Sequence, residues 1–311
     1  MKKGDDFISI HDLSTEEVWQ LLDLAADLKQ KQKAGIPHPY LQGKTLGMVF
    51  EKASTRTRVS FETGIYQLGG QGLFLSGRDL QIGRGEPIKD TARVLSRYVD
   101  GIMIRTFAHD TVLELAEYAS VPVINALTDL LHPCQAMADM MTAIEYKGKD
   151  LKGKKLTFIG DGNNMAHSLM FACAKLGLNF AFAGPKGYEP NPDIIAKAEA
   201  DAKQSGGSVE ILNDPMAAAK NADIFYTDVY ASMGQESEYE ERLQIFKGFQ
   251  VNSQLLSVAN TDPIVMHCLP AHREEEITDE VFEAQANVIL TKRKIVCTCK
   301  KPSWPPSCKT V

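Results

Sequence analysis

The sequence has no long uninterrupted apolar run. No stretch approaches the roughly 18 residues that a membrane-spanning helix requires. The first residues, Met-Lys-Lys-Gly-Asp-Asp, also lack the apolar core of a secretory signal. We therefore expect a protein that has no membrane partner and works in the cytoplasm.

A strong excess of one charge is also missing. The net charge is −6 with 24% charged residues, so neither a basic nucleic-acid surface nor a disordered acidic tail is indicated. The six cysteines are scattered over 311 residues, which is not the pattern of a disulfide framework. We expect no nucleic-acid partner, and any anion-binding site must be local.

Short apolar runs alternate with helical patterns along the whole chain. This rhythm predicts an α/β protein with two doubly wound parallel-sheet domains joined by interdomain helices. A charged, glycine-containing stretch at 147–154 predicts the boundary, giving domains 1–147 and 148–289 before a tail at 290–311. The expected strands are 46–50, 73–75, 101–104, 121–124, 155–159, 179–183, 209–212, 224–227 and 264–267.

The segment Ser54-Thr55-Arg56-Thr57-Arg58 stands between a predicted buried strand and a predicted helix. Free backbone N–H groups and the positive end of the helix dipole favour an anion at such a junction, and arginine adds permanently charged donors. A capped helix start with two solvated arginines is the alternative. The density of hydroxyl and guanidinium groups favours a phosphate site.

Polar residues follow several other predicted strands. Ligands of open parallel sheets bind beyond the carboxyl ends of the strands, so a shared position there indicates function. Each residue alone has a structural alternative: a hydrogen-bonded histidine, a small core cysteine, or a Gly-x-Gly turn too short to indicate a nucleotide. These residues are Arg105, His132, Gln135, Asp161, Asn163, Asn164, Asp228, His267 and Cys268.

Three of these segments resemble the signatures of the carbamoyltransferases: Ser54-Thr55-Arg56-Thr57-Arg58, His132-Pro133-Cys134-Gln135 and His267-Cys268-Leu269-Pro270. Asp228 and the loop Ser232-Met233-Gly234-Gln235-Glu236 are similar to the amino-acid-binding loop of the ornithine carbamoyltransferases. The resemblance covers about residues 5 to 289, with all motifs in family order and spacing.

The resemblance implies a first domain that binds carbamoyl phosphate. Donors such as Thr57, Arg105 and His132 would stabilise the negative charge that develops on the carbonyl oxygen during attack by an amine. Gln81 would reach the carbamoyl phosphate of a neighbouring subunit, in a homotrimer or a multiple of trimers. The implied carbamoyl-phosphate-binding residues are Ser54, Thr55, Arg56, Thr57, Gln81, Arg105, His132, Gln135, Cys268 and Leu269.

The resemblance also implies L-ornithine as the second substrate. Its α-amino and carboxylate groups would be held by Asn164, Asp228, Ser232 and Met233. Cys268 and the carbonyl of Leu269 would face its δ-amine, positioning the nucleophile without covalent catalysis by the thiol. The catalytic residues would be Arg105, His132, Asp228 and Cys268, with no metal and no organic cofactor.

The similarity ends abruptly after Val288-Ile289. The family continues with an acidic stretch ending in Glu-Asn-Arg, whose arginine contacts carbamoyl phosphate, and with a helix that crosses back to the first domain. The printed tail contains three prolines, Pro302, Pro305 and Pro306, which exclude such a helix. Its codons can be chosen so that the neighbouring reading frame gives FDEAENRMHMQKAILASLLQ, a segment with the expected arginine.

A one-base frameshift near Ile289 would explain this tail and would place Val296 where the family has its arginine. A divergent tail with a cysteine-rich end is the alternative, although Cys297, Cys299 and Cys308 lack a fourth zinc ligand. Two alternatives to ornithine carbamoylation also stay open. One is carbamoyl transfer to putrescine or aspartate, and the other is an inactive homologue that only binds carbamoyl phosphate.

Overall fold

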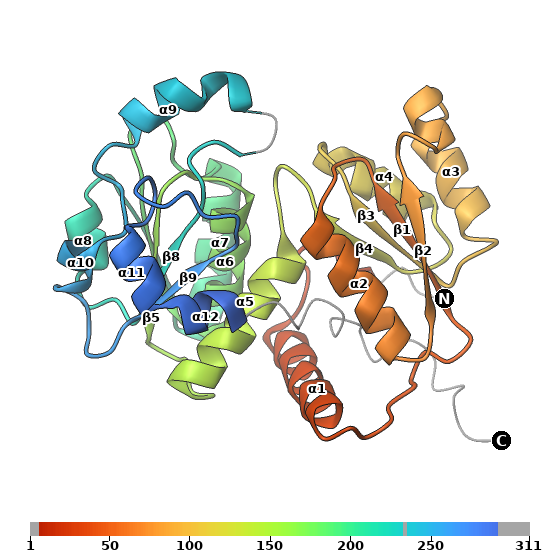
Figure 1. Ribbon diagram of the computed structural model, residues 1–311, viewed down its shortest axis with the longest axis horizontal. Coiled ribbons are helices and arrows are strands. Elements are labelled where there is room, and N and C mark those ends of the chain that lie inside the picture. Colours follow the sequence, from red (N-terminus) through yellow and green to blue (C-terminus); the bar gives the residue numbers. More distant parts are fainter. Residues whose placement is uncertain (1–5, 233–234, 292–311) are drawn as a thin grey trace. The chain divides into compact units, whose positions relative to one another are not determined.

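The computed structural model describes residues 6–232 and 235–291. These residues form two compact units, 6–138 and 139–291, and the division falls within one helix, α5 (Pro133–Lys147) (Figure 1). Neither unit contains a helix that is long and apolar enough to cross a membrane, as far as these residues extend. The tail at 292–311, including Val296 and the frameshift predicted near Ile289, lies outside the described residues.

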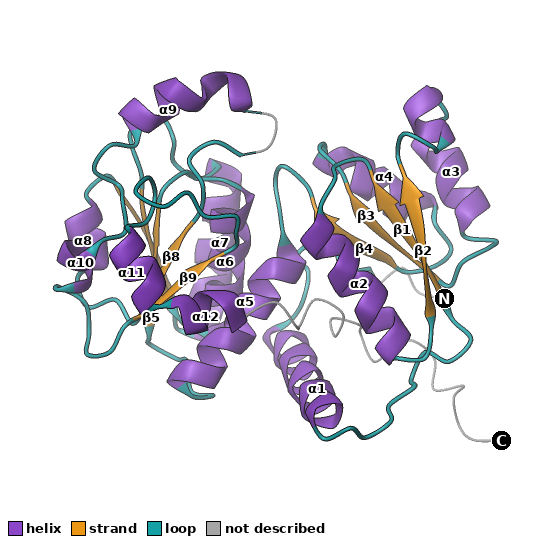
Figure 2. Ribbon diagram, viewed as in Figure 1, coloured by secondary structure: helices purple, strands orange, loops and turns teal. Residues whose placement is uncertain are grey.

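The first unit is a four-stranded parallel sheet in the order β2-β1-β3-β4, with helices between its strands (Figure 2). Its short 3₁₀ helix is η1. The elements are α1 (Thr15–Lys33), β1 (Thr45–Phe50), α2 (Thr55–Gln67), β2 (Gln71–Ser76), η1 (Gln81–Arg84), α3 (Ile88–Leu95), β3 (Gly101–Arg105), α4 (His109–Tyr118) and β4 (Val123–Leu127), before the start of α5.

Helices cover both faces of the first sheet. Alternate residues of a strand point to opposite faces, so neighbouring residues pack against different helices. Val49 belongs to a core cluster with Ala92 of α3 and Leu115 of α4. Its neighbour Met48 points the other way: a Cβ on Gly72 would lie 3.3 Å from Met48 and 3.2 Å from Ile65 of α2. The continuous burial of β1, β3 and β4 follows from this two-sided covering.

The second unit is a five-stranded parallel sheet in the order β7-β6-β5-β8-β9. Most of its helices lie between consecutive strands, and two follow the last strand. After the rest of α5, the elements are β5 (Lys155–Ile159), α6 (Asn164–Leu176), β6 (Asn179–Ala183), α7 (Pro192–Ser205), β7 (Ser208–Leu212), α8 (Pro215–Ala219), β8 (Ile224–Thr227), η2 (Glu236–Glu238), α9 (Tyr239–Ile245), α10 (Ser253–Leu256), β9 (Ile264–His267), α11 (Asp279–Ala284) and α12 (Ala286–Thr291).

The two faces of the second sheet have different cores. On one face Phe225 and Val265 pack with residues of α8, α10, α11 and α12. On the other face an aromatic row crosses three neighbouring strands: Phe158 stacks on Phe182 at 6.0 Å and on Tyr226 at 5.7 Å between ring centroids. These pairs are direct register partners, so the row fixes the alignment of β6, β5 and β8.

The α/β class and the parallel sheets predicted from the sequence are confirmed. Every predicted strand is present, with shifts of a few residues at the ends. The largest shift concerns β4, predicted at 121–124 and observed at Val123–Leu127. An irregular register between β3 and β4, next to Arg105, accompanies this later ending.

Candidate functional site

The junction of β1 and α2 has the geometry of an anion cradle. Ser54 is the N-cap of α2, and its hydroxyl accepts a hydrogen bond from the backbone N–H of Thr57 at 3.2 Å. No acidic residue lies in the first turn of the helix, so nothing there opposes the positive end of the dipole. The helix start predicted from the sequence is therefore also a suitable place for a phosphate.

Arg105 brings a buried positive charge to this cradle. It is the last residue of β3, it is 7% exposed, and its Nη1 donates to the Thr57 hydroxyl at 3.5 Å. Thr57 also receives the hydroxyl hydrogen bond of Ser54 at 3.1 Å. Three of the predicted binding residues, from two different strand ends, are thus brought together.

The two arginines of the segment differ in their surroundings. Arg56 is exposed in the first turn of α2. Arg58 is held on the helix surface, where its Nε donates to Glu62 at 3.1 Å and its guanidinium lies 3.7 Å from the centre of the Phe74 ring. The Arg58 guanidinium is therefore committed to Glu62 and Phe74.

Lys52 is a cation of this region that the sequence analysis did not select. It is 6% exposed, although it is only two residues beyond β1. Its ammonium donates to Asp129 at 3.2 Å and lies 4.9 Å from the centre of the Phe107 ring. Ligands of open parallel sheets bind beyond the carboxyl ends of the strands, and Lys52 follows such an end. Its position in the sequence alone could therefore have identified Lys52 as a candidate.

The imidazole of His132 lies near these cations, just before α5. Burial, followed by the positive charges of Arg105 and Lys52, holds its pKa well below the ordinary value of 6.5. The ring is therefore neutral at neutral pH. A neutral imidazole has one N–H donor, which suits a hydrogen bond to a carbonyl oxygen.

We expect the His132 ring to stay neutral where an ordinary histidine takes up a proton. In an NMR titration its midpoint should lie well below 6.5. Lys52→Met should raise this midpoint, because one repelling charge is removed. Since the folded pKa is lower than the unfolded one, the stability linked to His132 is present above the unfolded pKa and is lost as the pH falls through the folded pKa. A midpoint at the ordinary value would contradict this electrostatic picture.

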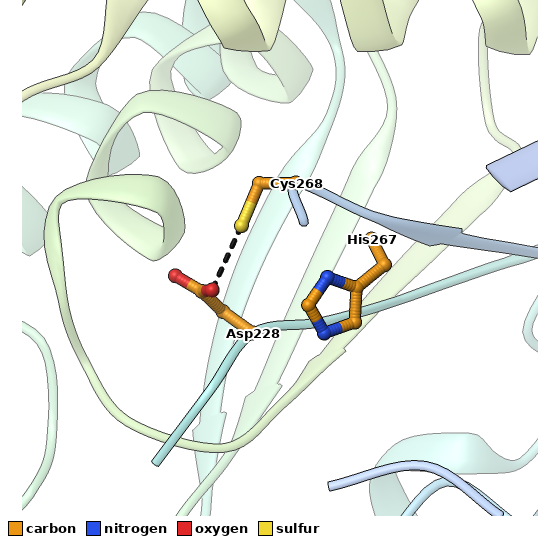
Figure 3. Close-up of side chains that lie close together, drawn as sticks. All are labelled: Asp228, His267 and Cys268. Carbon is orange, nitrogen blue, oxygen red and sulfur yellow. Dashed lines mark hydrogen bonds between the residues drawn. The ribbon is translucent and has the colours of Figure 1, made fainter. Parts of the chain in front are cut away.

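A second group of polar residues lies at the ends of β8 and β9 (Figure 3). Asp228 follows β8 and is 7% exposed. Its Oδ1 accepts from the Cys268 thiol at 2.7 Å and from the backbone N–H of Val229 at 2.8 Å, and its Oδ2 accepts from Asn163 at 2.9 Å. The carboxylate is thus fixed in orientation by three donors.

His267 holds the loop that carries Cys268. Its Nδ1 accepts from the backbone N–H of Leu269 at 2.8 Å, which places the ring proton on Nε2, 2.9 Å from Glu276. Leu269 has φ 63°, a left-handed conformation that is unfavourable for a branched residue. The hydrogen bond that Leu269 donates to His267 stabilises this turn, which sets the position of the Cys268 thiol.

The other predicted residues are placed as follows. Gln81 begins η1 and is exposed, and Gln135 is half-buried in the first turn of α5. Asn164 begins α6, but its neighbour Asn163 is the residue that caps this helix and contacts Asp228. Ser232 is half-buried, and its backbone N–H donates to Gln235 at 2.9 Å. Met233 lies outside the described residues.

The short Gly-x-Gly motif after β5 has a packing explanation. A Cβ on Gly162 would come within 2.4 Å of the backbone of Glu189 and Pro190, so only glycine fits. The loop is also fixed by the hydrogen bond from the Gly162 N–H to the Tyr188 carbonyl at 2.9 Å. The motif therefore brings two loops close together, and it supplies no separate indication of a nucleotide.

Among the residues that the structure describes, two sets combine side chains that can ligate a metal. The ligand atoms of Asp228, His267 and Cys268 lie within 4.8 Å of one another, as do those of a second set, His272, Glu275 and Glu276. In the first set, both ring nitrogens of His267 are already engaged by Leu269 and Glu276. In the second, the carboxylate of Glu276 also accepts from the His272 backbone N–H at 2.6 Å. These contacts show that each set helps to hold the segment that follows β9.

Comparison with known families covers both units. Residues 5–145 match the family described as "Aspartate/ornithine carbamoyltransferase, carbamoyl-P binding domain". Residues 152–294 match the one described as "Aspartate/ornithine carbamoyltransferase, Asp/Orn binding domain". The two matches together account for most of the chain, in the order that the sequence motifs predict.

Individual relatives agree with these family matches. An ornithine carbamoyltransferase of Thermococcus kodakarensis is 57% identical over 287 residues, which cover 92% of this chain and 91% of that protein. One from Anoxybacillus flavithermus is 58% identical over 288 residues, covering 93% and 91%. The solved structure of the ornithine carbamoyltransferase from Pyrococcus furiosus aligns with a TM-score of 0.91 at 54% identity, over 95% of this chain and 94% of that one.

Proposed function

The chain belongs to the aspartate/ornithine carbamoyltransferase family, and we propose that it transfers the carbamoyl group of carbamoyl phosphate to the δ-amine of L-ornithine, giving L-citrulline and phosphate. The structural observation that supports an amino-acid acceptor is the fixed carboxylate of Asp228 beside the Cys268 thiol at the ends of β8 and β9, and the similarity to ornithine carbamoyltransferases supports ornithine. An anionic group there complements the ammonium groups of a basic amino acid.

We propose that residues 1–147 bind carbamoyl phosphate through the cradle at the start of α2. The phosphate would accept hydrogen bonds from the backbone and hydroxyls of Ser54, Thr55 and Thr57 and from the guanidinium of Arg56. Arg105 would be shared between the phosphate and the carbonyl oxygen. The buried charge of Arg105 next to Thr57 supports this role, because a desolvated cation interacts strongly with an anion.

The carbonyl oxygen of carbamoyl phosphate would receive further hydrogen bonds as negative charge develops on it. A neutral His132 has an N–H to donate, and Gln135 could bind the carbamoyl nitrogen through its amide oxygen. Donors that are fixed before the reaction stabilise the tetrahedral intermediate without reorganisation. The neutral δ-amine forms the C–N bond when it attacks and gives this intermediate. The C–O bond breaks when the intermediate collapses, and the departing phosphate takes the proton that the nitrogen loses.

Residues 148–289 would bind ornithine. Asp228 would pair with the α-ammonium group, while Asn164, Ser232 and the backbone of Met233 would hold the carboxylate. Cys268 and the Leu269 carbonyl would face the δ-amine, and they are also candidates for contact with the carbamoyl group. The hydrogen bond between Cys268 and Asp228 supports this arrangement, because it orients the thiol toward the same carboxylate.

The remaining proposals extend to the assembly and the cellular role. We infer a homotrimer, or a multiple of trimers, in which Gln81 reaches the carbamoyl phosphate of a neighbouring subunit. We further infer an enzyme of arginine metabolism that works in the cytoplasm, without a metal, an organic cofactor, a nucleic acid or a membrane. The exposed position of Gln81 in η1 is compatible with contact to a second copy.

The test of the reaction is citrulline formation with ornithine, compared with carbamoylation of putrescine and aspartate. Ornithine should be the only efficient acceptor. Turnover with putrescine would show that an α-carboxylate is not required, and turnover with aspartate would show that the second unit binds a different amino acid. Binding of carbamoyl phosphate without any turnover would indicate the inactive homologue.

Restoring the neighbouring reading frame after Ile289 should increase activity. The restored tail would have arginine at the position of Val296. One missing donor to a developing charge typically lowers the rate about 100-fold or more, so we expect a gain of about this size over the printed chain. Resequencing the gene supplies the control. Equal rates for the two chains, or a gene that encodes the printed tail in an unshifted frame, would contradict the frameshift hypothesis.

A further inference from the structure

Arg242 of α9 is a buried cation outside the residues that the sequence analysis selected. It is 6% exposed, and its guanidinium donates hydrogen bonds to Asp161, Tyr230 and Glu238. Its Nη1 donates to Asp161 at 3.1 Å and to the backbone carbonyl of Tyr230 at 2.9 Å, and its Nε donates to Glu238 at 3.0 Å. One side chain therefore joins three segments of the second unit.

Two of these segments carry the proposed ornithine-binding residues. Asp161 follows β5 and lies two residues before Asn163, which caps α6 and donates to Asp228. Tyr230 lies midway between Asp228 and Ser232 in the segment after β8. The guanidinium therefore connects the loop that bears Asn163 with the loop that bears Asp228.

Aromatic rings enclose the guanidinium. It lies 5.1 Å from the centre of the Tyr188 ring and 5.9 Å from that of Phe246. Phe246 in turn stacks on Tyr230 at 4.8 Å and meets Tyr188 edge-on at 5.0 Å. A planar, delocalised cation fits such a setting better than an ammonium group, which would keep the charge and lose the stacking and the forked hydrogen bonds.

A contribution to the stability of the fold does not explain the buried ion pair of Arg242 and Asp161. Well-packed apolar residues often replace such pairs without loss, because burying two charges costs as much as their attraction returns. The cost is visible at Asp161, where burial raises the pKa to about 6 although Arg242 opposes the change, and the charge of Asp228 pushes in the same direction as burial. An ion pair with forked geometry does, however, define the relative position of the loops that it joins.

We propose that Arg242 is a positioning residue for amino-acid binding. By holding Asp161 and the Tyr230 carbonyl together, it fixes Asn164, Asp228 and Ser232 in the arrangement that receives the α-amino and carboxylate groups of ornithine. This inference rests on the proposed function. It assigns Arg242 no contact with the substrate. Its effect should appear in ornithine binding and should leave carbamoyl phosphate binding unaltered.

Kinetics of matched variants test this assignment. Arg242→Met should raise KM for ornithine by at least about tenfold, since small displacements of binding groups are costly, and should leave KM for carbamoyl phosphate nearly unchanged. Arg242→Lys, which keeps the charge but reaches fewer acceptors, should fall between the wild type and Arg242→Met. Glu238→Gln removes only the charge of a partner whose side chain is 53% exposed, and should change both constants by less than about twofold.

A second buried ion pair supplies the control for general destabilisation. Lys175 and Asp201 join α6 and α7 at 2.8 Å with side chains 11% and 6% exposed. Lys175 is eleven residues from the start of α6, so it lies about 16 Å along the helix from Asn164. Lys175→Met should lower the melting temperature and leave KM for ornithine unchanged. If it raised this KM as much as Arg242→Met does, the proposal would be overturned.

Hydrogen exchange measures the positioning without any substrate. In Arg242→Met or Arg242→Lys, the amides of Val229, Ser232 and Gln235 should exchange faster than in the wild type, whereas in Lys175→Met they should not. Unchanged exchange together with an unchanged ornithine KM in a folded Arg242 variant would refute the proposal. If the wild-type chain forms no citrulline, the proposed function fails, but the exchange comparison still decides the role of Arg242.

Discussion

Replacing Arg105 by methionine should lower kcat/KM for carbamoyl phosphate by about 10³- to 10⁴-fold. Two losses combine in this value. A hydrogen bond to a charged phosphate contributes roughly 1.5–3 kcal/mol, and a donor to the developing oxyanion contributes about 3 kcal/mol. Together they approach 5 kcal/mol, which corresponds to this factor in rate. The burial of Arg105 beside Thr57 is the reason for counting both losses.

The measurement is steady-state kinetics at saturating ornithine, with the melting temperature as a check of folding. Arg105→Lys keeps the charge but loses the fork, and it should recover only part of the activity. Arg93→Met is the matched control, because Arg93 is an exposed arginine of α3 that pairs with Asp90. A folded Arg105→Met enzyme with nearly normal kcat/KM would remove Arg105 from the proposed mechanism.

Replacing Asp228 by asparagine should lower kcat/KM for ornithine by about 10²- to 10³-fold. The substitution keeps the size of the side chain but removes the charge that would pair with the substrate ammonium, a loss of about 1.5–3 kcal/mol. It also turns one acceptor into a donor. Asp228 receives hydrogen bonds on both oxygens, so the new amide must face Asn163 or else Val229 and Cys268, leaving a buried donor unpaired at a cost of about 1–3 kcal/mol.

Carbamoyl phosphate binding by Asp228→Asn, measured directly by calorimetry, should stay normal. Asp223→Asn is the control within the same strand region. Asp223 immediately precedes β8, at the opposite end from Asp228, and accepts from the backbone of Lys155 at 2.8 Å. Asp223→Asn should lower the melting temperature and change kcat/KM for ornithine little. If Asp228→Asn bound ornithine normally, or if both aspartate variants lost activity equally, Asp228 would not be the amino-acid-binding carboxylate.

Local patterns in the sequence were sufficient to predict the sheets and the junction of strand and helix at Ser54. The patterns that predict a buried strand before Ser54 and a helix after it each lie within a short stretch of sequence. The structure confirms both elements, with Ser54 as the N-cap of the helix. The first helix also begins with a local signal, because Ser14 and Glu17, three residues apart, form a capping box. Elements whose signal is local were therefore predictable in type and nearly in extent.

Residues whose role depends on distant partners were missed. Lys52 looks like a surface lysine until Phe107 and Asp129 bury it. Arg242 stands in a charged helix, and only the fold brings Asp161 and Tyr230 to it. Asn163 and Asn164 are identical in type and adjacent, so only the geometry of the cap shows which one contacts Asp228. In each case the deciding contact joins parts of the chain that sequence periodicity cannot relate.

The most direct test of the proposed reaction is the rate of citrulline formation from carbamoyl phosphate and ornithine by the chain with the restored tail, followed together with phosphate release. Equal amounts of citrulline and phosphate are expected, with ornithine strongly preferred over aspartate and putrescine and with activity lost in Arg105→Met and Asp228→Asn. Phosphate release without citrulline, or carbamoylation of another amine in preference to ornithine, would contradict it.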